Sequence, residues 1–239
     1  MKTYFLQPES IRELFDTIAP RYDFLNHLLS LRRDIYWRQA AVQELKGIEG
    51  WILDIATGTG DVAIEIFRQN GLNRKVFGLD FSLPMIQGAY QKLIKKDLSR
   101  VIALTLGDAL SLPFHNNTFS ATMIAFGLRN ILNKEHALSE MVRVTKGGGK
   151  VVVLEFTLPR RGLMKKLYLS YFNTILPWVG GFFSGNRGAY AYLPKSVLHF
   201  QSAKHYEEMM DRAGLEKVSD HGLTSSITSI ITGLKPIAS

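Results

Sequence analysis

Four aspartates surround a short glycine loop in the first half of the chain. Asp54 precedes the Gly-Thr-Gly loop at residues 58–60, and Asp61 follows it directly. Asp80 lies twenty residues beyond the loop, and Asp108 lies further along the chain. Carboxylates accept hydrogen bonds and attract cations, while glycines let a ligand approach the main chain because they lack a Cβ. These residue types at this spacing predict a site for a small polar ligand.

The positions of the acids indicate which parts of a ligand they would bind. A carboxylate about twenty residues after a glycine loop, at the end of the neighbouring strand, suits hydrogen bonds from ribose hydroxyls. Asp80 has this position, and Asp108, after the next strand, is placed to accept a hydrogen bond from an adenine amino group. We therefore expect the ligand to contain adenosine.

Two classes of adenosine cofactor fit this loop. The run GTGDVA, residues 58–63, matches the GxGxxG/A fingerprint of dinucleotide-binding proteins, so an NAD-dependent oxidoreductase is one candidate. However, Asp61 would place a carboxylate at the helix start where a pyrophosphate binds, and the two anions repel each other. S-adenosylmethionine carries no phosphate, and its cationic amino group suits carboxylates at Asp54 and Asp61. Its sulfonium can also rest against aromatic faces. The charge of Asp61 favours S-adenosylmethionine, and the oxidoreductase stays open.

Apolar strands alternate with amphipathic helices over residues 51–156, which predicts a mostly parallel sheet with both faces covered. Ligands of such sheets bind beyond the carboxyl ends of the strands, where the loop and the acids lie. Two short strands at residues 217–221 and 226–234 are expected to form a terminal hairpin. The predicted strands are residues 51–56, 75–80, 101–106, 119–126 and 150–156. The predicted helices are residues 61–70, one capped by Ser82 that runs to about Lys96, one through Ala137 and Val142 that is broken by Gly147, Gly148 and Gly149, and one capped by Ser202 that runs to about Ala213.

The two flanking regions lack this alternation. Residues 1–46 are expected to be mostly helical, with Ser10 capping a helix that Pro20 stops and a second helix from about Asp34 that Gly47 ends. Between these helices, the chain either packs across the top of the sheet or forms a flexible lid.

The second flanking region, residues 159–200, is too short and too rich in glycine for a core of its own. We interpret it as an insertion for contact with a substrate or a membrane, so that residues 1–239 form one domain.

Composition narrows the classes of function. The chain has 239 residues and no cysteine, which excludes disulfides, thiolate zinc sites and a cysteine nucleophile, and we expect no metal. Neither a signal peptide nor an apolar run long enough to span a bilayer is expected. The net charge of +8 fits either an ordinary basic surface or attraction to nucleic acid or an anionic lipid surface.

Several runs of the sequence resemble the signature blocks of a known family. They are DIATGTGD, GLDFSLPM, GDALSLPF, FGLRN followed by ALSEMVRVTKGGG, LEF and AYAYLPKSVLHF, with FDTIAPRYDFLNHLLSLRRDIYWR upstream. These blocks resemble the ubiquinone/menaquinone biosynthesis C-methyltransferases, and the likeness to the demethylmenaquinone methyltransferases covers nearly the whole chain. The resemblance implies an α/β, Rossmann-like class I fold dependent on S-adenosylmethionine. Its sheet would have seven mostly parallel strands with a terminal antiparallel hairpin.

The resemblance also implies a set of cofactor contacts. In the family, positions matching Thr59, Asp80, Asp108 and Ala109 contact S-adenosyl-L-methionine, whose product is S-adenosyl-L-homocysteine. A serine is common in the family where this chain has Ala125, so one hydroxyl contact is missing here. The full predicted cofactor set is Asp54, Gly58, Thr59, Gly60, Asp80, Phe81, Asp108, Ala109 and Ala125.

The implied substrate is a polyprenylated hydroquinone, either demethylmenaquinol or the equivalent ubiquinone precursor, methylated at a ring carbon. That carbon becomes nucleophilic when its ortho hydroxyl loses a proton. Arg129 is our first candidate for stabilising the phenolate or holding a water that takes the proton, and Asn130 would orient the same hydroxyl. Tyr22 is a weaker candidate, as are Tyr192 and His199.

The same implied substrate predicts where the enzyme works. Aromatic residues between Trp178 and Tyr192 either belong to the core or line a groove for the isoprenoid tail. Basic pairs at residues 160–161 and 165–166 would hold the enzyme at an anionic surface. We expect a cytoplasmic enzyme, peripheral at the inner face of the membrane, and a homodimer stays open. An RNA methyltransferase ranks last, because no interleaving of aromatic and basic residues marks a base-stacking surface; we expect no nucleic-acid partner.

Overall fold

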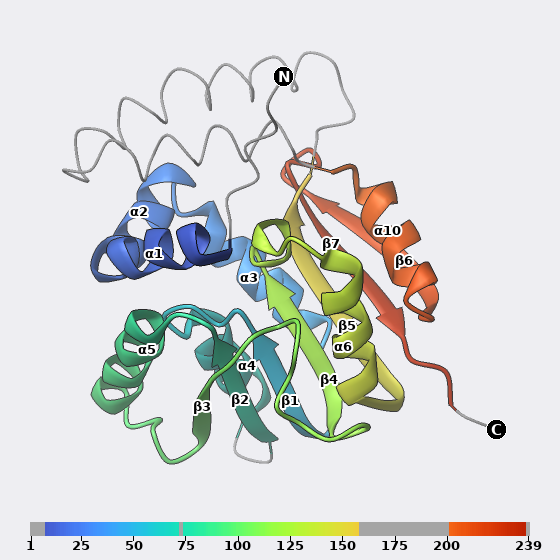
Figure 1. The fold of residues 1–239 in the computed structure, drawn as a ribbon, viewed down its shortest axis with the longest axis horizontal. Coiled ribbons are helices and arrows are strands. Elements are labelled where there is room, and N and C mark those ends of the chain that lie inside the picture. The colour runs from blue at the N-terminus through green and yellow to red at the C-terminus, as the bar shows by residue number, and fades with distance from the viewer. Residues whose placement is uncertain (1–7, 72–73, 158–200, 238–239) are drawn as a thin grey trace.

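The computed structural model describes residues 8–71, 74–157 and 201–237, which build around one seven-stranded sheet (Figure 1). Its first five strands run parallel, whereas β7 is antiparallel to both β5 and β6. The predicted parallel sheet with a terminal hairpin is therefore confirmed. The strands, in their order across the sheet, are β3 (Ile102–Leu106), β2 (Arg74–Asp80), β1 (Gly50–Ile55), β4 (Phe119–Ala125), β5 (Thr145–Phe156), β7 (Thr228–Leu234) and β6 (Glu216–Leu223).

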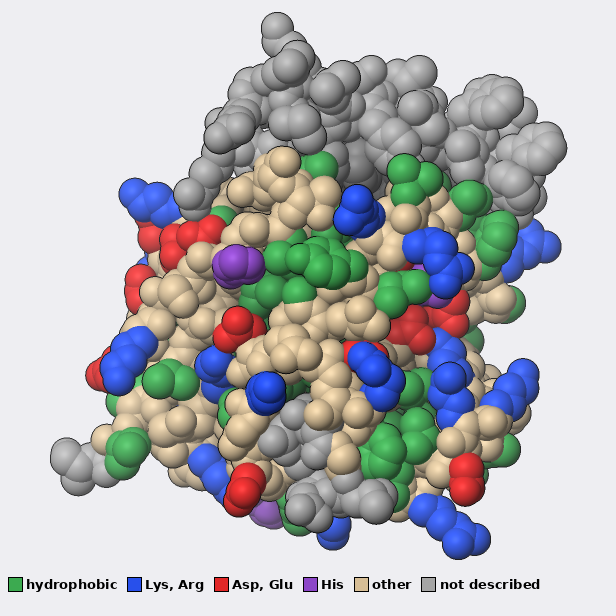
Figure 2. Space-filling model, turned by 180° about the vertical axis from the view of Figure 1, so that it is seen from behind, with side chains coloured by type: hydrophobic (Ala, Val, Ile, Leu, Met, Phe, Trp, Pro, Cys, Tyr) green, Lys and Arg blue, Asp and Glu red, His purple; other side chains and the backbone are tan. Residues whose placement is uncertain are grey.

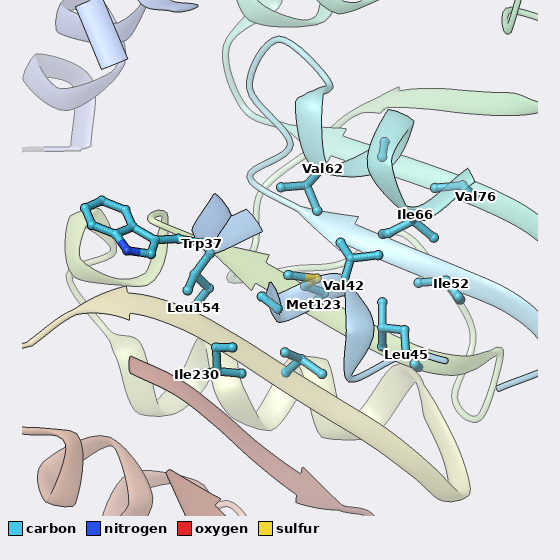
Figure 3. Close-up of a cluster of buried hydrophobic side chains, with 14 of the residues drawn as sticks. Trp37, Val42, Leu45, Ile52, Val62, Ile66, Val76, Met123, Leu154 and Ile230 are labelled. Atoms are coloured by element: carbon cyan, nitrogen blue, oxygen red, sulfur yellow. The ribbon is translucent and has the colours of Figure 1, made fainter. Parts of the chain in front are cut away.

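Helices cover both faces of the sheet, and each face has its own apolar core. On one face, buried side chains of α3 (Arg33–Gln43) and α4 (Asp61–Asn70) pack with those of β1 and β4 (Figure 3). Trp37, Val42 and Ile66 belong to this cluster, together with Leu93 of α5 (Leu83–Lys95). On the other face, α6 (Lys134–Val144) and α10 (Ala203–Arg212) contribute the buried side chains. This burial on both sides explains why the central parts of these strands are mostly apolar.

Local signals set several element ends as predicted. Ser82 precedes α5, and its Oγ accepts a hydrogen bond from the Met85 main chain; Ser202 caps α10 in the same way. Gly71 follows α4 with a φ of +73°, a conformation that favours glycine. The two serine caps satisfy main-chain N–H groups that a helix start leaves unpaired.

Three predicted boundaries are wrong. Helix α3 ends at Gln43, and a turn separates it from Gly47, which was predicted to end it. The first helix, α1 (Pro8–Ile18), begins before Ser10, so Ser10 lies inside its first turn and is not the cap. Proline suits the first position of a helix because its missing N–H would be unpaired there. The glycines at residues 147–149 do not break α6, which ends earlier, at Val144; they lie within β5. A Cβ on Gly149 would come within 2.7 Å of the Ser120 carbonyl oxygen, so this close approach of β4 and β5 requires glycine.

The N-terminal region is helical, as predicted. After α1, a 3-10 turn (Ala19–Arg21) leads into α2 (Tyr22–Leu29), and α3 follows. Side chains of α1 and α2 contact the loops at the carboxyl ends of β1 and β2. The predicted insertion at residues 159–200 lies outside the described residues, as do the aromatic and basic groups assigned to it and both Tyr192 and His199.

The described surface mixes charges of both signs. On the face in Figure 2, Lys and Arg side chains are spread among acidic and apolar ones. None of the helices within the described ranges is long and apolar enough to cross a bilayer.

Candidate active site

A pocket opens at the carboxyl ends of β1, β2 and β4. It encloses about 960 Å³ of empty space, counting its open mouth. Because β1 pairs with both β2 and β4, the order of the strands reverses at this point, and ligands of open α/β sheets bind there. Eight of the twelve predicted site residues line the pocket: Tyr22, Gly58, Asp80, Phe81, Asp108, Ala109, Ala125 and Asn130. Apolar side chains complete its walls, among them Ile11, Phe15, Phe126, Ile131 and Leu132.

The glycine loop joins β1 to α4 through a turn that only glycine adopts easily. Gly60 has a φ of +84° and stands directly before α4, and a Cβ there would lie 3.2 Å from the Cβ of Ala89. Gly58 has a φ of +54° and lines the pocket. The predicted tight loop at a helix start is confirmed.

Asp80 ties this loop to the end of β2. Its Oδ2 accepts a hydrogen bond from the Gly58 main chain at 2.8 Å, and its Oδ1 accepts one from the Ser82 main chain at 2.9 Å. Burial raises the pKa of Asp80, and these main-chain donors oppose that effect. Each carboxylate oxygen has two lone pairs, so both retain capacity for a further donor such as a ribose hydroxyl.

Asp54 is a buried acid, and only one of its two carboxylate oxygens has a hydrogen-bond partner among the described residues. Its Oδ2 accepts a hydrogen bond from Thr57 Oγ1 at 2.5 Å, whereas Oδ1 has no hydrogen-bond partner among the described residues. The side chain is 1% exposed, and burial raises its pKa to about 7. Thr57 and the Ala63 main chain oppose the effect of burial on this pKa. Asp54 lies beside the glycine loop but is not among the residues that line the pocket, so its contact with the cationic amino group of S-adenosylmethionine stays a prediction.

Thr59 and Asp61 are turned toward neighbouring helices. The Thr59 hydroxyl donates to Asp23 Oδ1 and accepts from Lys92 Nζ at 3.1 Å. Asp61 pairs with Lys92 at 2.5 Å and with Arg38 at 3.5 Å. The sequence argument placed Asp61 beside a cationic ligand; in the structure, two cations of the protein balance its charge.

The loop after β3 carries the predicted adenine contact. Asp108 is exposed, lines the pocket and accepts a hydrogen bond from the Leu110 main chain through Oδ1, which makes a tight turn. Two residues of α6 hold the continuation of this loop. Glu140 accepts from the Leu112 main chain, and Arg143 donates to the Leu112 carbonyl.

Tyr22 begins α2 and lies at the pocket wall, with Phe15 and Phe81 nearby. Burial raises the pKa of Tyr22, although the charges of Arg38 and Arg129 partly oppose this. At neutral pH the phenol therefore keeps its proton, which makes Tyr22 a hydrogen-bond donor and a poor base.

Arg129 and Asn130 belong to a 3-10 turn (Leu128–Asn130) after β4, where the sequence placed a loop. Asn130 lines the pocket, but Arg129 is not among the lining residues. The guanidinium instead pairs with Glu155 at 2.6 Å. Glu155 is not among the predicted site residues; the signal that could have identified it is the single acid in the otherwise apolar run VVVLEF.

Comparison with known proteins agrees with this geometry. The chain is 43% identical over 228 residues to the ubiquinone/menaquinone biosynthesis C-methyltransferase UbiE of Geotalea daltonii, which covers 95% of this chain and 97% of that protein. It is 42% identical over 224 residues to the demethylmenaquinone methyltransferase of Thermus thermophilus, covering 93% and 100%.

Solved structures agree with the predicted fold. A methyltransferase of Thermotoga maritima that depends on S-adenosylmethionine superposes with a TM-score of 0.65 at 19% identity, over 94% of this chain and 99% of that one. At this identity the likeness concerns the fold alone, and it confirms the predicted class I methyltransferase architecture.

Neither the oxidoreductase nor the RNA methyltransferase is supported by these matches. A family model described as the ubiE/COQ5 methyltransferase family matches residues 4–235. With nearly the whole chain matched and relatives above 40% identity, the protein belongs to the ubiE/COQ5 methyltransferase family.

Proposed function

We propose that the protein transfers a methyl group from S-adenosylmethionine to a ring carbon of a polyprenylated hydroquinone. The products are the methylated quinol, S-adenosylhomocysteine and one proton, which the ring carbon loses. The acceptor is demethylmenaquinol or the equivalent ubiquinone precursor, because the relatives carry these activities in their names. The observation that carries the cofactor assignment is the pair of buried acids, with Asp80 fixed by two main-chain donors and Asp54 holding an unpartnered oxygen.

The residues present fit S-adenosylmethionine, which when bound supplies an electrophilic methyl group. Asp80 would accept hydrogen bonds from the ribose hydroxyls, and Asp108 from the adenine amino group. Asp54 would pair with the cationic amino group. The protein contributes binding and alignment here, since the cofactor already carries the reactivity.

Activation of the acceptor falls to residues at the other side of the pocket. Tyr22, protonated at neutral pH, would donate a hydrogen bond to the developing phenolate, and Asn130 would orient the same oxygen. Arg129 would supply positive charge from behind the turn. Apolar walls at Phe126 and Ile131 would exclude water from the ring and strengthen these interactions.

The site of action follows from the substrate. A polyprenyl tail stays in a bilayer, so we infer a cytoplasmic enzyme that contacts the inner face of the membrane through residues 159–200. This assignment rests on the sequence of that segment. Release of the protein from anionic vesicles at high salt would support it, whereas equal partitioning to neutral vesicles would contradict it.

A labelled-cofactor experiment tests the proposed function. The protein is incubated with methyl-labelled S-adenosylmethionine and a panel of demethylated benzoquinols and naphthoquinols, and the products are analysed by mass spectrometry. We expect label on a ring carbon of at least one quinol. In parallel, equilibrium dialysis should detect binding of S-adenosylmethionine and S-adenosylhomocysteine, and none of NAD. Transfer to no quinol would overturn the acceptor assignment, and binding of NAD alone would overturn the cofactor assignment.

A further inference from the structure

Glu155 is a fully buried acid at the end of β5. Its described hydrogen bonds come from Arg129, in the turn after β4, and from the next residue of its own strand. Its Oε1 accepts from Arg129 Nη1 at 2.6 Å and from the Phe156 main chain at 2.9 Å. Its Oε2 accepts from the Arg129 main chain at 3.0 Å. One carboxylate therefore holds both the side chain and the main chain of Arg129, on the strand next to β4.

The guanidinium of Arg129 is confined on other sides as well. It lies 5.9 Å from the centroid of the Phe126 ring and 5.1 Å from that of Phe156, distances at which a cation is attracted to an aromatic face. An arginine side chain has several rotatable bonds, and ordering it costs conformational entropy. In this structure the ion pair with Glu155 and the contacts with the two rings order the side chain during folding, before any substrate binds.

The turn fixed in this way forms part of the pocket wall. Gly127 and Asn130, on either side of Leu128 and Arg129, line the pocket, and the Asn130 main chain donates to the Gly127 carbonyl at 3.0 Å. The charge of Arg129 also acts on Tyr22, another lining residue, where it opposes the effect of burial on the pKa. The guanidinium thus lies within electrostatic reach of the pocket although its described ion pair points to β5.

We propose that Glu155 is a positioning residue for the methyl transfer: it holds the Arg129 guanidinium and the turn Leu128–Asn130 in one arrangement, so that Arg129 and Asn130 act on the acceptor hydroxyl. This inference rests on the proposed function, since it requires an acceptor on which negative charge develops. Preorganised groups stabilise such charge without reorganising during the reaction.

The Glu155→Gln variant is the first test, with Glu65→Gln as its matched control. Glu65 also pairs with an arginine, Arg68, on α4 and away from the pocket lining, but that pair is more exposed and both of its hydrogen bonds come from the arginine side chain. In Glu155→Gln we expect kcat to fall by about 10²-fold, because small displacements of catalytic groups have effects of this size. The affinity for S-adenosylmethionine and the KM for the quinol should stay nearly unchanged. The control should keep the wild-type kcat; a Glu155→Gln enzyme with wild-type kcat would overturn the inference.

A double-mutant cycle separates positioning from general stability. Arg129→Ala should leave the affinity for S-adenosylmethionine nearly intact while kcat drops sharply. Because Glu155 acts in large part through the Arg129 guanidinium, adding Glu155→Gln to Arg129→Ala should lower kcat by much less than it does in the wild type; the loss that remains comes from the main-chain contact. The double variant should also be more stable than Arg129→Ala, in which a buried charge lacks its partner. Losses of kcat that multiply would contradict the inference.

A measurement without substrate keeps the test independent of the proposed function. In nitrogen-15 NMR spectra of the wild-type protein, the two Nη groups of Arg129 should give separate resonances because the ion pair restricts rotation about Cζ. Arg129→Lys assigns these resonances. In Glu155→Gln they should merge, and in Glu155→Asp, which keeps the charge but shortens the side chain, they should shift while the fold is retained.

The outcomes distinguish the two proposals. Merged Nη resonances in the wild-type protein would overturn the positioning role even if methyl transfer is observed. Separate resonances together with no transfer to any quinol would remove the acceptor assignment, and with it the catalytic meaning of the ion pair. If Glu155→Gln does not fold, Glu155→Asp carries the kinetic test, and a wild-type kcat in that variant would overturn the inference.

Discussion

At the scale of single residues, the acids in and beside the pocket differ in their environments. Asp54 is buried beside Thr57 with one oxygen unpartnered, Asp80 is held by two main-chain donors, and Asp61 is balanced by Lys92 and Arg38. Burial raises the pKa of Asp54 to about 7. Asp54 is therefore the residue whose ionisation is expected to depend on whether a cation is bound.

We expect the affinity for S-adenosylmethionine to rise with pH because binding its amino group requires ionised Asp54. Below pH 7 a proton must leave Asp54 first, so the affinity should rise by up to about tenfold per pH unit between pH 5.5 and 7 and level off above. Isothermal titration calorimetry over pH 5.5–7.5 measures this slope. Asp54→Asn should bind more weakly at pH 7.5 and show no such slope.

The matched control for this titration is Asp97→Asn. Asp97 is exposed at the end of α5 and has a φ of +56°, which asparagine tolerates. This variant should keep both the affinity and the slope of the wild type. A slope that persists in Asp54→Asn would assign the titration to another group.

At the scale of elements, each N-terminal helix is tied to one loop of the site. Asp16 of α1 accepts a hydrogen bond from Ser82, at the end of β2, and Asp23 of α2 accepts one from Thr59 in the glycine loop. Asp23 also pairs with Lys92 of α5 at 2.7 Å. The helices α1 and α2 thus connect to the two loops that the cofactor would contact, so cofactor release is the step at which a lid would act.

We expect Asp23→Asn to speed cofactor release. Loss of a partly exposed, charge-assisted contact weakens closure by about 1 kcal/mol, which corresponds to about fivefold in the dissociation rate. Stopped-flow displacement of S-adenosylhomocysteine measures this rate. Glu13→Gln, which changes an exposed acid on α1, should leave it unchanged. Equal rates in Asp23→Asn and the wild type would mean that these helices do not control release.

At the scale of the whole molecule, the sequence predicted what short-range chemistry determines. The strand and helix pattern, the caps at Ser82 and Ser202, and the turn at Gly60 depend on neighbouring residues, and all were predicted correctly. The partners of Asp61 and Arg129 were missed because they come from other elements of the fold, and no periodicity encodes such contacts. The prediction that the glycines at residues 147–149 break the helix was wrong for the same reason, since Gly149 is required by the close approach of β4 to β5.

The pH dependence of global stability follows from the same buried acid. The pKa of Asp54 is about 7 in the folded protein against 3.8 as its ordinary value, so the folded state holds this proton more tightly than the unfolded state does. The free energy of unfolding should therefore decrease as pH rises from about 4 to 7, by up to about 4 kcal/mol from this group, and change little above. The raised pKa of Asp80 acts in the same direction.

Urea unfolding of the cofactor-free protein between pH 5 and 8 measures this loss, and Asp54→Asn should reduce it. Saturating S-adenosylmethionine should restore stability most strongly above pH 7, where ionised Asp54 gains its cationic partner; at a hundredfold excess over Kd, binding contributes about 2.7 kcal/mol. Parallel pH profiles of stability for wild type and Asp54→Asn would show that Asp54 does not cause the loss of stability. If the cofactor stabilises the protein equally at pH 5.5 and pH 8, its binding does not depend on the charge of Asp54. That result would contradict the proposed pairing of Asp54 with the amino group.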